Sequence, residues 1–324
     1  MKVFMTGGTG NIGQYVLQAF IRAGHRIVLL TRTPDRIPAY REIPEVTLIQ
    51  GNILDFETLR KAVQGCDAVV HIALGWGNDP VSMLENDTKV TAVLLDAAEK
   101  AGVHKFIYTS STAAVGNMQD GTNEESPCRP TDLYGATKAS GEAYTLGFRQ
   151  YYSRQGGYGE KVLLKRNVIR PGYTFSNPAV PEGASQSDGR FAAICEKIVA
   201  GQDISLDIND GTQFLSARQI AQVYLKVLES DLNEEIIFAL GRNFVSWYEI
   251  ACMAKELMPE SGSRISSPSA EKRHPCYDVS KLEKVLGLSF DSREDLREHI
   301  AWNLERAIAK AAGNEVHNTN HENG

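Results

Sequence analysis

Cysteine is scarce in this sequence and forms no recognisable pattern. The 324 residues include only five cysteines, an odd number, and no two are spaced as Cys-x-x-Cys. This excludes a disulfide framework and a zinc ribbon, and no other metal site is expected because the seven histidines form no ligand motif. Reduced thiols are typical of the cytoplasm, so we expect a cytoplasmic protein.

Two further absences narrow the classes of partner. Basic residues are not in excess, since 34 lysines and arginines stand against 40 aspartates and glutamates, for a net charge of −6. Neither a nucleic acid nor an anionic membrane surface is therefore an expected partner. No apolar run approaches the roughly 20 residues that a membrane-spanning helix needs, and the residues after Met1 lack the shape of a signal peptide.

The sequence does contain a regular alternation of short apolar runs and amphipathic stretches. Such runs between turns are typical of buried parallel strands, and the stretches carry apolar residues on one helical face. The alternation predicts an α/β fold, a Rossmann-type doubly wound parallel sheet of about seven strands with helices on both faces. The predicted strands are Val3–Thr6, Ile27–Thr31, Val46–Gln50, Ala68–Leu74, Lys105–Ser110, Val162–Ile169 and Ile236–Leu240.

This regularity weakens after Pro171, which suggests two regions and a tail. The first is a dinucleotide-binding domain and the second a smaller, mostly helical substrate-binding region. The polar end of the chain has no apolar anchor and is expected to be a disordered tail. The predicted bounds are 1–172 plus about 213–242 for the first, about 173–212 plus 243–312 for the second, and 313–324 for the tail.

A glycine-rich turn lies between the first predicted strand and the first helix. Gly7 permits a tight turn, Gly10 lets the backbone approach a pyrophosphate, and Gly13 allows the helix to pack closely on the strand. The helix start at Asn11-Ile12 presents free N–H groups and a partial positive charge to phosphates. In this strand–turn–helix context, the glycines predict a dinucleotide site.

The end of the second predicted strand favours one cofactor. NAD-binding sheets usually place an acidic residue here, about 20 residues past the glycines, to hold the ribose 2′-hydroxyl. This chain has Thr31 and Arg32 instead. No carboxylate repels a 2′-phosphate, and a guanidinium can pair with it. NADP is therefore the preferred cofactor, with NAD as the open alternative.

Tyr134 and Lys138 are spaced to lie on one helical face. A neighbouring ammonium, together with the positive nicotinamide of the oxidised cofactor, favours the phenolate and is expected to lower the pKa of Tyr134. The phenol can then exchange a proton with a substrate hydroxyl while a hydride passes to or from the cofactor. Ser111 follows the strand at Lys105–Ser110, at the sheet edge where ligands bind, and its hydroxyl can bind the same reacting oxygen.

In these motifs the chain resembles the extended short-chain dehydrogenase/reductase family, in its epimerase/dehydratase branch. The resemblance runs from Lys2 to about Ala309. Its motifs are Thr6-Gly7-Gly8-Thr9-Gly10-Asn11-Ile12-Gly13, His71-Ile72-Ala73, Leu94-Leu95-Asp96-Ala97-Ala98, Thr109-Ser110-Ser111, Tyr134–Lys138 and Arg170-Pro171-Gly172.

The resemblance implies roles for individual residues. Tyr134 would be the catalytic acid/base, Lys138 would tune it and hold the nicotinamide ribose, and Ser111 would be the hydroxyl partner. The adenine would lie beside Asn52 and Ile53. It also implies a homodimer, formed through the Val90–Lys100 and Tyr134–Ser153 helices. Further cofactor contacts are expected at Ala73, Leu74, Thr109 and Pro171.

The departures from the family pattern concern the substrate. Thr112-Ala113 replaces the Asp-Glu pair of sugar-nucleotide dehydratases, Tyr173 replaces a usual Asn, and Thr212 stands where nucleotide-sugar enzymes carry an Arg. Asp87 takes the place of a usual buried Asn. Two residues that would bind a diphosphate are therefore absent, which argues against a nucleotide-sugar substrate. The arginines that can substitute are Arg190, Arg218, Arg264 and Arg273.

Three functions are consistent with these residues. The favoured one is an NAD(P)-dependent oxidoreductase that interconverts a secondary alcohol and a carbonyl on a small molecule. The second is a sugar or nucleotide-sugar epimerase that holds its cofactor tightly. The third is an NADP-sensing regulatory protein without turnover, which has no need of Tyr134 with Lys138. Trp76 either stacks on substrate or fills a gap.

Overall fold

The computed structural model describes residues 1–154 and 164–313. Its centre is one seven-stranded parallel sheet in the order β11-β6-β5-β4-β1-β2-β3, so the predicted Rossmann-type sheet is confirmed. The strands are β1 (Lys2–Thr6), β2 (Arg26–Thr31), β3 (Val46–Gln50), β4 (Ala68–His71), β5 (Lys105–Thr109), β6 (Lys165–Pro171) and β11 (Glu235–Ala239).

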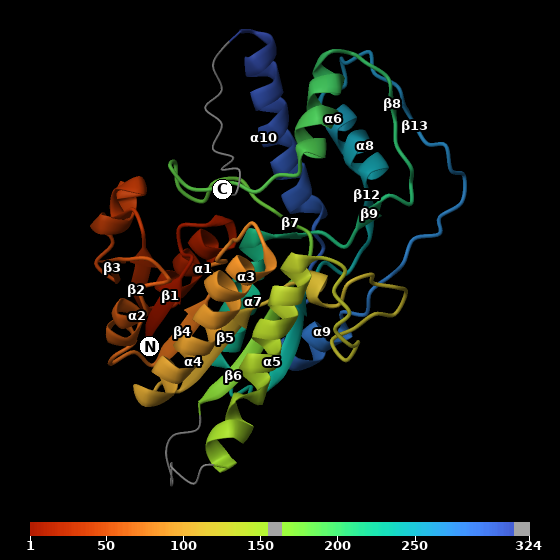
Figure 1. Cartoon of the computed structure of the whole chain (residues 1–324). Helices are drawn as coiled ribbons and strands as arrows, with labels where there is room; N and C mark the ends of the chain where they lie inside the picture. Colours follow the sequence, from red (N-terminus) through yellow and green to blue (C-terminus); the bar gives the residue numbers. More distant parts are fainter. Residues whose placement is uncertain (155–163, 314–324) are drawn as a thin grey trace.

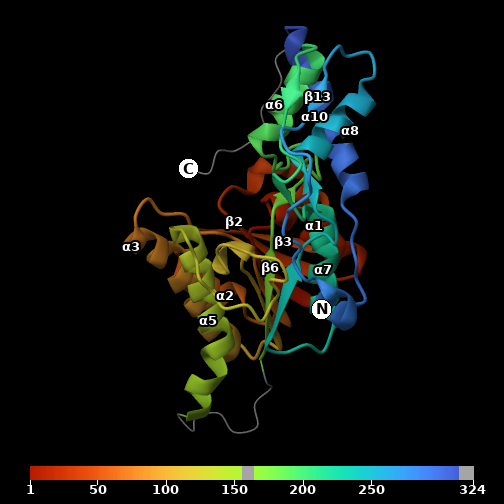
Figure 2. The same cartoon turned by 90° about the vertical axis from the view of Figure 1, so that its right-hand side faces the viewer.

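Helices cover both faces of this sheet (Figures 1 and 2). Alternate side chains of β1 point to opposite faces: Val3 and Met5 join one core, and Phe4 joins the other. This two-sided burial is why the strands read as unbroken apolar runs. The first core includes α1 (Asn11–Arg22) and α7 (Ala217–Glu229); the second includes α2 (Phe56–Ala62), α4 (Lys89–Lys100) and α5 (Leu133–Arg154).

A third core lies beyond the carboxyl ends of the strands, at the top of Figure 1. Phe191, Phe214 and Trp247 meet there edge to face. The helices around it are α6 (Gly189–Val199), α8 (Trp247–Leu257) and α10 (Arg293–Ala311). Short strand pairs accompany them: β7 (Thr174–Phe175) with β10 (Leu215–Ser216), β8 (Ile204–Ser205) with β13 (Ile265–Ser266), and β9 (Gly211–Thr212) with β12 (Val245–Ser246).

Two predicted strands differ from the observed strands by more than one residue at an end. The strand expected at Ala68–Leu74 stops at His71, because the chain then turns so that the Ala73 N–H donates to Thr6 Oγ1 at 3.2 Å. The strand expected at Val162–Ile169 begins at Lys165 and continues to Pro171, where it pairs with Ala239.

Some expectations fall outside the described residues. These include residue 162, at the start of the expected sixth strand, and all of the expected tail except Gly313. Within 1–154 and 164–313, no helix is long and apolar enough to cross a membrane.

Candidate active site

The glycine turn after β1 forms a cradle without side chains. Gly7 adopts a φ of +75°, and a Cβ there would lie 2.5 Å from the Ala73 nitrogen. A Cβ on Gly13 would overlap the Gly7 carbonyl oxygen. Helix α1 then starts after Gly10 with no side-chain cap, which leaves its first N–H groups available to an anion. The cradle therefore fits the pyrophosphate of a dinucleotide.

The residues expected around the adenosine half lie at the ends of β2 and β3. Thr31 is buried and ends β2, while Arg32 is exposed and forms no ion pair with any residue that the structure describes. Asn52 accepts a hydrogen bond from the Leu54 N–H at 3.0 Å, and Ile53 packs against the second core. The Arg32 guanidinium is thus available to a phosphate.

Buried polar groups hold the β1–β4 junction. Thr6 Oγ1 lies 2.7 Å from His71 Nδ1, and burial together with the Lys138 charge lowers the pKa of His71 to about 3. His71 is therefore neutral and structural. Thr109, where a cofactor contact is expected, also takes part in the packing of the sheet against α7. Its hydroxyl lies 2.6 Å from Tyr224 Oη. Leu74 follows Ala73 in the same half-buried segment, and Pro171 is buried at the end of β6.

Ser111 and Tyr134 lie near each other at the carboxyl end of β5. Ser111 caps the short helix η4 (Thr112–Ala114), where its Oγ accepts the Ala113 N–H at 3.1 Å. Tyr134 lies in the first turn of α5, which Asp132 caps by accepting the Gly135 N–H at 2.6 Å. The Ser111 hydroxyl lies close enough to the Tyr134 phenol to act on its pKa. Both hydroxyl groups can therefore hydrogen-bond to the same substrate oxygen.

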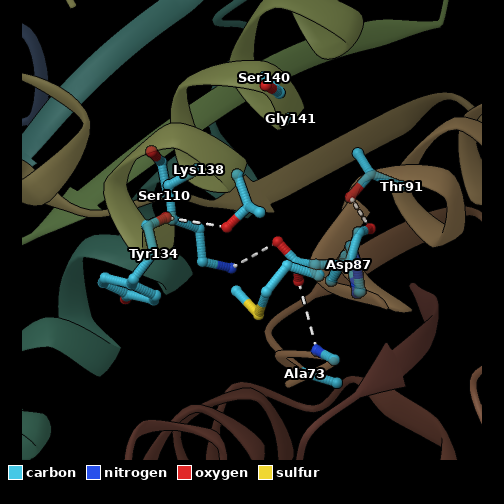
Figure 3. A network of polar contacts seen from close by, with 12 residues as sticks. Ala73, Asp87, Thr91, Ser110, Tyr134, Lys138, Ser140 and Gly141 are labelled. Atoms are coloured by element: carbon cyan, nitrogen blue, oxygen red, sulfur yellow. Dashed lines mark hydrogen bonds and ion pairs between the residues drawn. The ribbon is translucent and has the colours of Figure 1, made fainter. Parts of the chain in front are cut away.

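Lys138 lies one turn further along α5 and reaches away from the phenol (Figure 3). Its Nζ is 5.9 Å from the centre of the Tyr134 ring but 3.5 Å from Asp87 Oδ2. Both partners of this ion pair are buried. Asp87 belongs to the π-helical segment η3 (Leu84–Thr88), which joins α3 (Pro80–Met83) to α4.

Without the oxidised cofactor, Lys138 alone does not give the lowered Tyr134 pKa that we expect from the two charges together. Burial raises the pKa of Tyr134, and the charges of Asp87 and Asp132 raise it further, against the opposing effect of the Ser111 hydroxyl. The Lys138 charge does not produce the expected lowering because it is directed at Asp87. Burial in turn lowers the pKa of Lys138, which Asp87 partly offsets.

Trp76 flanks the phenol and does not fill a gap in the core. Its side chain is 44% exposed, and its ring centre lies 6.3 Å from that of Tyr134. The Trp76 carbonyl accepts a hydrogen bond from Asn86 Nδ2 at 2.7 Å, and the Gly75 N–H donates to Asp87 Oδ1 at 3.3 Å. The indole is thus held where a substrate can reach it.

A cavity of about 440 Å³ opens beside the residue that follows Ser111. No charged side chain lines it. Tyr277 reaches it from a distant loop, and its backbone N–H donates to Gln213 Oε1 at 2.6 Å. No spacing in the sequence indicated Tyr277. The lining residues are Thr112, Gly116, Asn117, Met118, Gln119, Gly172, Tyr173, Thr212, Leu240 and Tyr277.

The four arginines that could bind a diphosphate in place of the absent residues all have carboxylate partners. Arg190 is the one among them that contacts a cavity residue, donating to Tyr173 Oη at 3.4 Å while its guanidinium lies 4.0 Å from the centre of a Trp247 ring. The pairs are Arg190 with Asp188 and Asp210, Arg218 with Asp295 and Glu298, Arg264 with Asp203, and Arg273 with Glu271.

The described part of the chain contains no candidate metal site. No group of three or more His, Cys, Asp or Glu side chains there could hold an ion. The five cysteines are all free.

A parallel sheet with a glycine cradle at the junction of β1 and β4 places this chain among the dinucleotide-binding Rossmann proteins. Comparison with known proteins narrows the class, since the sequence model of the NAD dependent epimerase/dehydratase family matches residues 3–241. The chain therefore belongs to that family.

Individual relatives differ in what their names say they do. The chain is 30% identical to a 3-beta-hydroxysteroid dehydrogenase of Mycolicibacterium neoaurum over 159 residues, 45% of this chain and 43% of that protein. It is 31% identical to a 2-alkyl-3-oxoalkanoate reductase of Shewanella oneidensis over 177 residues, 52% and 43% of the two chains. These matches thus span less than half of each relative's length.

The solved structures show the same fold. A UDP-glucuronic acid 4-epimerase from Bacillus cereus, in complex with UDP-glucuronic acid and NAD, superposes with a TM-score of 0.74. The superposition covers 96% of this chain and all of that one, at 20% sequence identity. At this identity the likeness concerns the fold and leaves the substrate open.

Proposed function

We propose that this protein is an NAD(P)-dependent oxidoreductase that interconverts a carbonyl and a secondary alcohol on a small, uncharged substrate. The observation that carries the proposal is the pairing of Ser111 with Tyr134 next to a cavity without charged side chains. The aromatic faces of Trp76, Tyr173 and Tyr277 favour an apolar or planar body over a polyhydroxylated sugar.

The chemistry divides between the cofactor and three side chains. When bound, a reduced nicotinamide supplies a hydride to the carbonyl carbon. Tyr134 Oη donates a proton to the carbonyl oxygen, and Ser111 orients that oxygen through a second hydrogen bond. Lys138 would hold the nicotinamide ribose from the following turn of α5. Tyr134 then recovers its proton from solvent.

We also propose NADP as the preferred cofactor. Support comes from Arg32, which is exposed beside the end of β2 and has no ion-pair partner within the described residues. The homodimer and the cytoplasmic location belong to the same proposal, and the five free cysteines support a reducing compartment. We also propose that the chain divides into the dinucleotide-binding domain and the substrate-binding region predicted from its sequence.

Activity measurements test this function directly. The purified protein is incubated with NADPH or NADH and a panel of ketones, aldehydes and β-keto compounds, and cofactor oxidation is followed by absorbance. We expect turnover with at least one uncharged carbonyl compound, and its loss in the Tyr134→Phe variant. Turnover that persists unchanged in Tyr134→Phe contradicts the assignment.

A nucleotide-sugar epimerase is the second candidate, because Arg190 reaches Tyr173 at the cavity and the same fold carries such epimerases. Calorimetry with UDP, dTDP and GDP, each with saturating cofactor, separates the two. Losing one charge-assisted hydrogen bond costs about 1.5–3 kcal/mol, about 10- to 150-fold in affinity, so the two absent diphosphate-binding residues predict weak binding. Micromolar binding of any of the three nucleotides would place the epimerase first.

A further inference from the structure

A carboxylate lies buried behind the proposed proton donor. Asp87 has no exposed surface, and its Oδ2 lies 3.5 Å from Lys138 Nζ (Figure 3). Its Oδ1 accepts the Gly75 N–H at 3.3 Å. The carboxylate therefore connects the loop that carries Trp76 to the lysine of α5.

The other titratable groups around this pair are neutral or engaged elsewhere. Tyr108 of β5 and Tyr134 of α5 both have a raised pKa, for which burial is the main cause and the Asp87 charge a further one. His71 of β4 is neutral because burial and Lys138 lower its pKa to about 3. Glu142 of α5 also acts on Tyr108, but it is paired with Arg170 at 2.7 Å.

Charge balance then decides the state of the phenol. A lone ammonium near Tyr134 would favour the phenolate, whereas a carboxylate opposes it. With Asp87 beside Lys138, the buried pair has no net charge, and Coulomb effects are strong at such depth. An asparagine in the same place could accept the Gly75 hydrogen bond without this balance.

We propose that Asp87 is a positioning residue that balances Lys138 and keeps Tyr134 protonated, so that the site is built to donate a proton to a carbonyl oxygen. In that direction a hydride from NAD(P)H forms the new C–H bond and the carbonyl π electrons move to oxygen. The Tyr134 proton forms the O–H bond and leaves a phenolate behind. The proposal rests on the proposed function for its chemistry, but its electrostatic part does not need a substrate.

Ultraviolet absorbance of the phenolate tests the electrostatic part. Wild type and Asp87→Asn are titrated with pH, each with and without Tyr134→Phe, so that the difference reports Tyr134 alone. We expect Tyr134 to titrate at lower pH in Asp87→Asn than in wild type. Asp87→Ser removes the same charge with a smaller side chain and gives the same expectation if Asp87→Asn does not fold.

Asp132→Asn is the matched control. It removes another carboxylate that raises the pKa of Tyr134, but Asp132 is exposed and screened by water, and Asn caps a helix as well as Asp. We expect a smaller shift from this variant. A Tyr134 titration that stays in place or moves to higher pH when the Asp87 charge is removed overturns the proposal.

A kinetic readout follows once a substrate is known. In Asp87→Asn, the limb of the pH profile of kcat/KM that reports Tyr134 should move to lower pH by about the same amount as the spectroscopic titration. A merely structural role would lower kcat/KM without moving that limb. If no carbonyl compound is turned over but the titration moves, the proposed function fails and the charge balance stands.

Discussion

Tyr134 is the residue on which the proposed chemistry depends. Its hydroxyl is needed only where charge develops on the substrate oxygen, while its ring packs beside Trp76 whether or not the hydroxyl is present. Lys138 differs, because it balances Asp87 and would also hold the cofactor ribose. The two residues should therefore respond differently to substitution.

We expect Tyr134→Phe to lower kcat by about 100-fold or more, the low end for a general acid, with little change in cofactor affinity. Lys138→Met should reduce both, because it removes a cofactor contact and leaves the buried Asp87 unpaired. Steady-state kinetics and fluorescence titration of the cofactor measure the two effects. A large loss of cofactor affinity in Tyr134→Phe would contradict the separation of roles.

Arg32 is expected to set the cofactor preference. Arg32→Ala should weaken NADPH binding by about 1.5–3 kcal/mol, the range for a charged hydrogen bond, and leave NADH nearly unaffected. Fluorescence titration of both cofactors gives the answer, with Arg36→Ala in the following short helix as the control. Equal losses for the two cofactors, or a wild type that prefers NADH, would show that Arg32 does not read the 2′-phosphate.

At the scale of elements, helix α5 is held in place by buried charges. Glu142 accepts hydrogen bonds from Arg170 of β6 at 2.7 Å and also binds the Ser110 hydroxyl after β5. One carboxylate thus joins α5 to the ends of two strands. This junction sets the distance between Ser111, which follows Ser110, and Tyr134, which begins α5.

Breaking the junction should be costly. Glu142→Gln leaves the Arg170 guanidinium buried without its counter-charge, so we expect a loss of about 3–5 kcal/mol in the free energy of unfolding, measured with urea. Glu57→Gln is the control, because it breaks an exposed pair with Lys61 and should cost much less. Similar urea midpoints for the two variants would show that the buried pair contributes no more than a surface pair.

At the scale of the whole molecule, α4 and α5 lie together on one side of the sheet (Figure 2). Tyr144 of α5 is 54% exposed and presents an aromatic ring on this side of the molecule. The resemblance that predicts a homodimer places the interface on these helices. The exposed ring is then a candidate contact between two copies.

Sedimentation tests this association. We expect the wild type to sediment as a species of twice the chain mass of 35.6 kDa, and Tyr144→Asp to sediment as a monomer. Val285→Asp, which alters an exposed apolar side chain on α9 (Ser280–Leu286), should remain a dimer. A wild type that is monomeric at micromolar concentration would contradict the prediction.

The sequence by itself determined the sheet and the place of the glycine turn, and it predicted that Ser111 and Tyr134 act together. Each depends on local patterns: apolar runs buried on both faces, glycines between a strand and a helix, and a hydroxyl at a strand end. Parallel strands bring their carboxyl ends to one edge, so these local patterns converge without any knowledge of side-chain packing.

Only the tertiary structure decided the partner of Lys138, the place of Tyr277 and the pairing of Arg218 and Arg264. Asp87, Tyr277 and the carboxylates on these two arginines come from distant segments, and no periodicity connects them to the site. The effect of Asp87 on the Tyr134 pKa was missed for the same reason. Burial and the balance of buried charges depend on how the segments pack, and helical spacing alone does not contain that information.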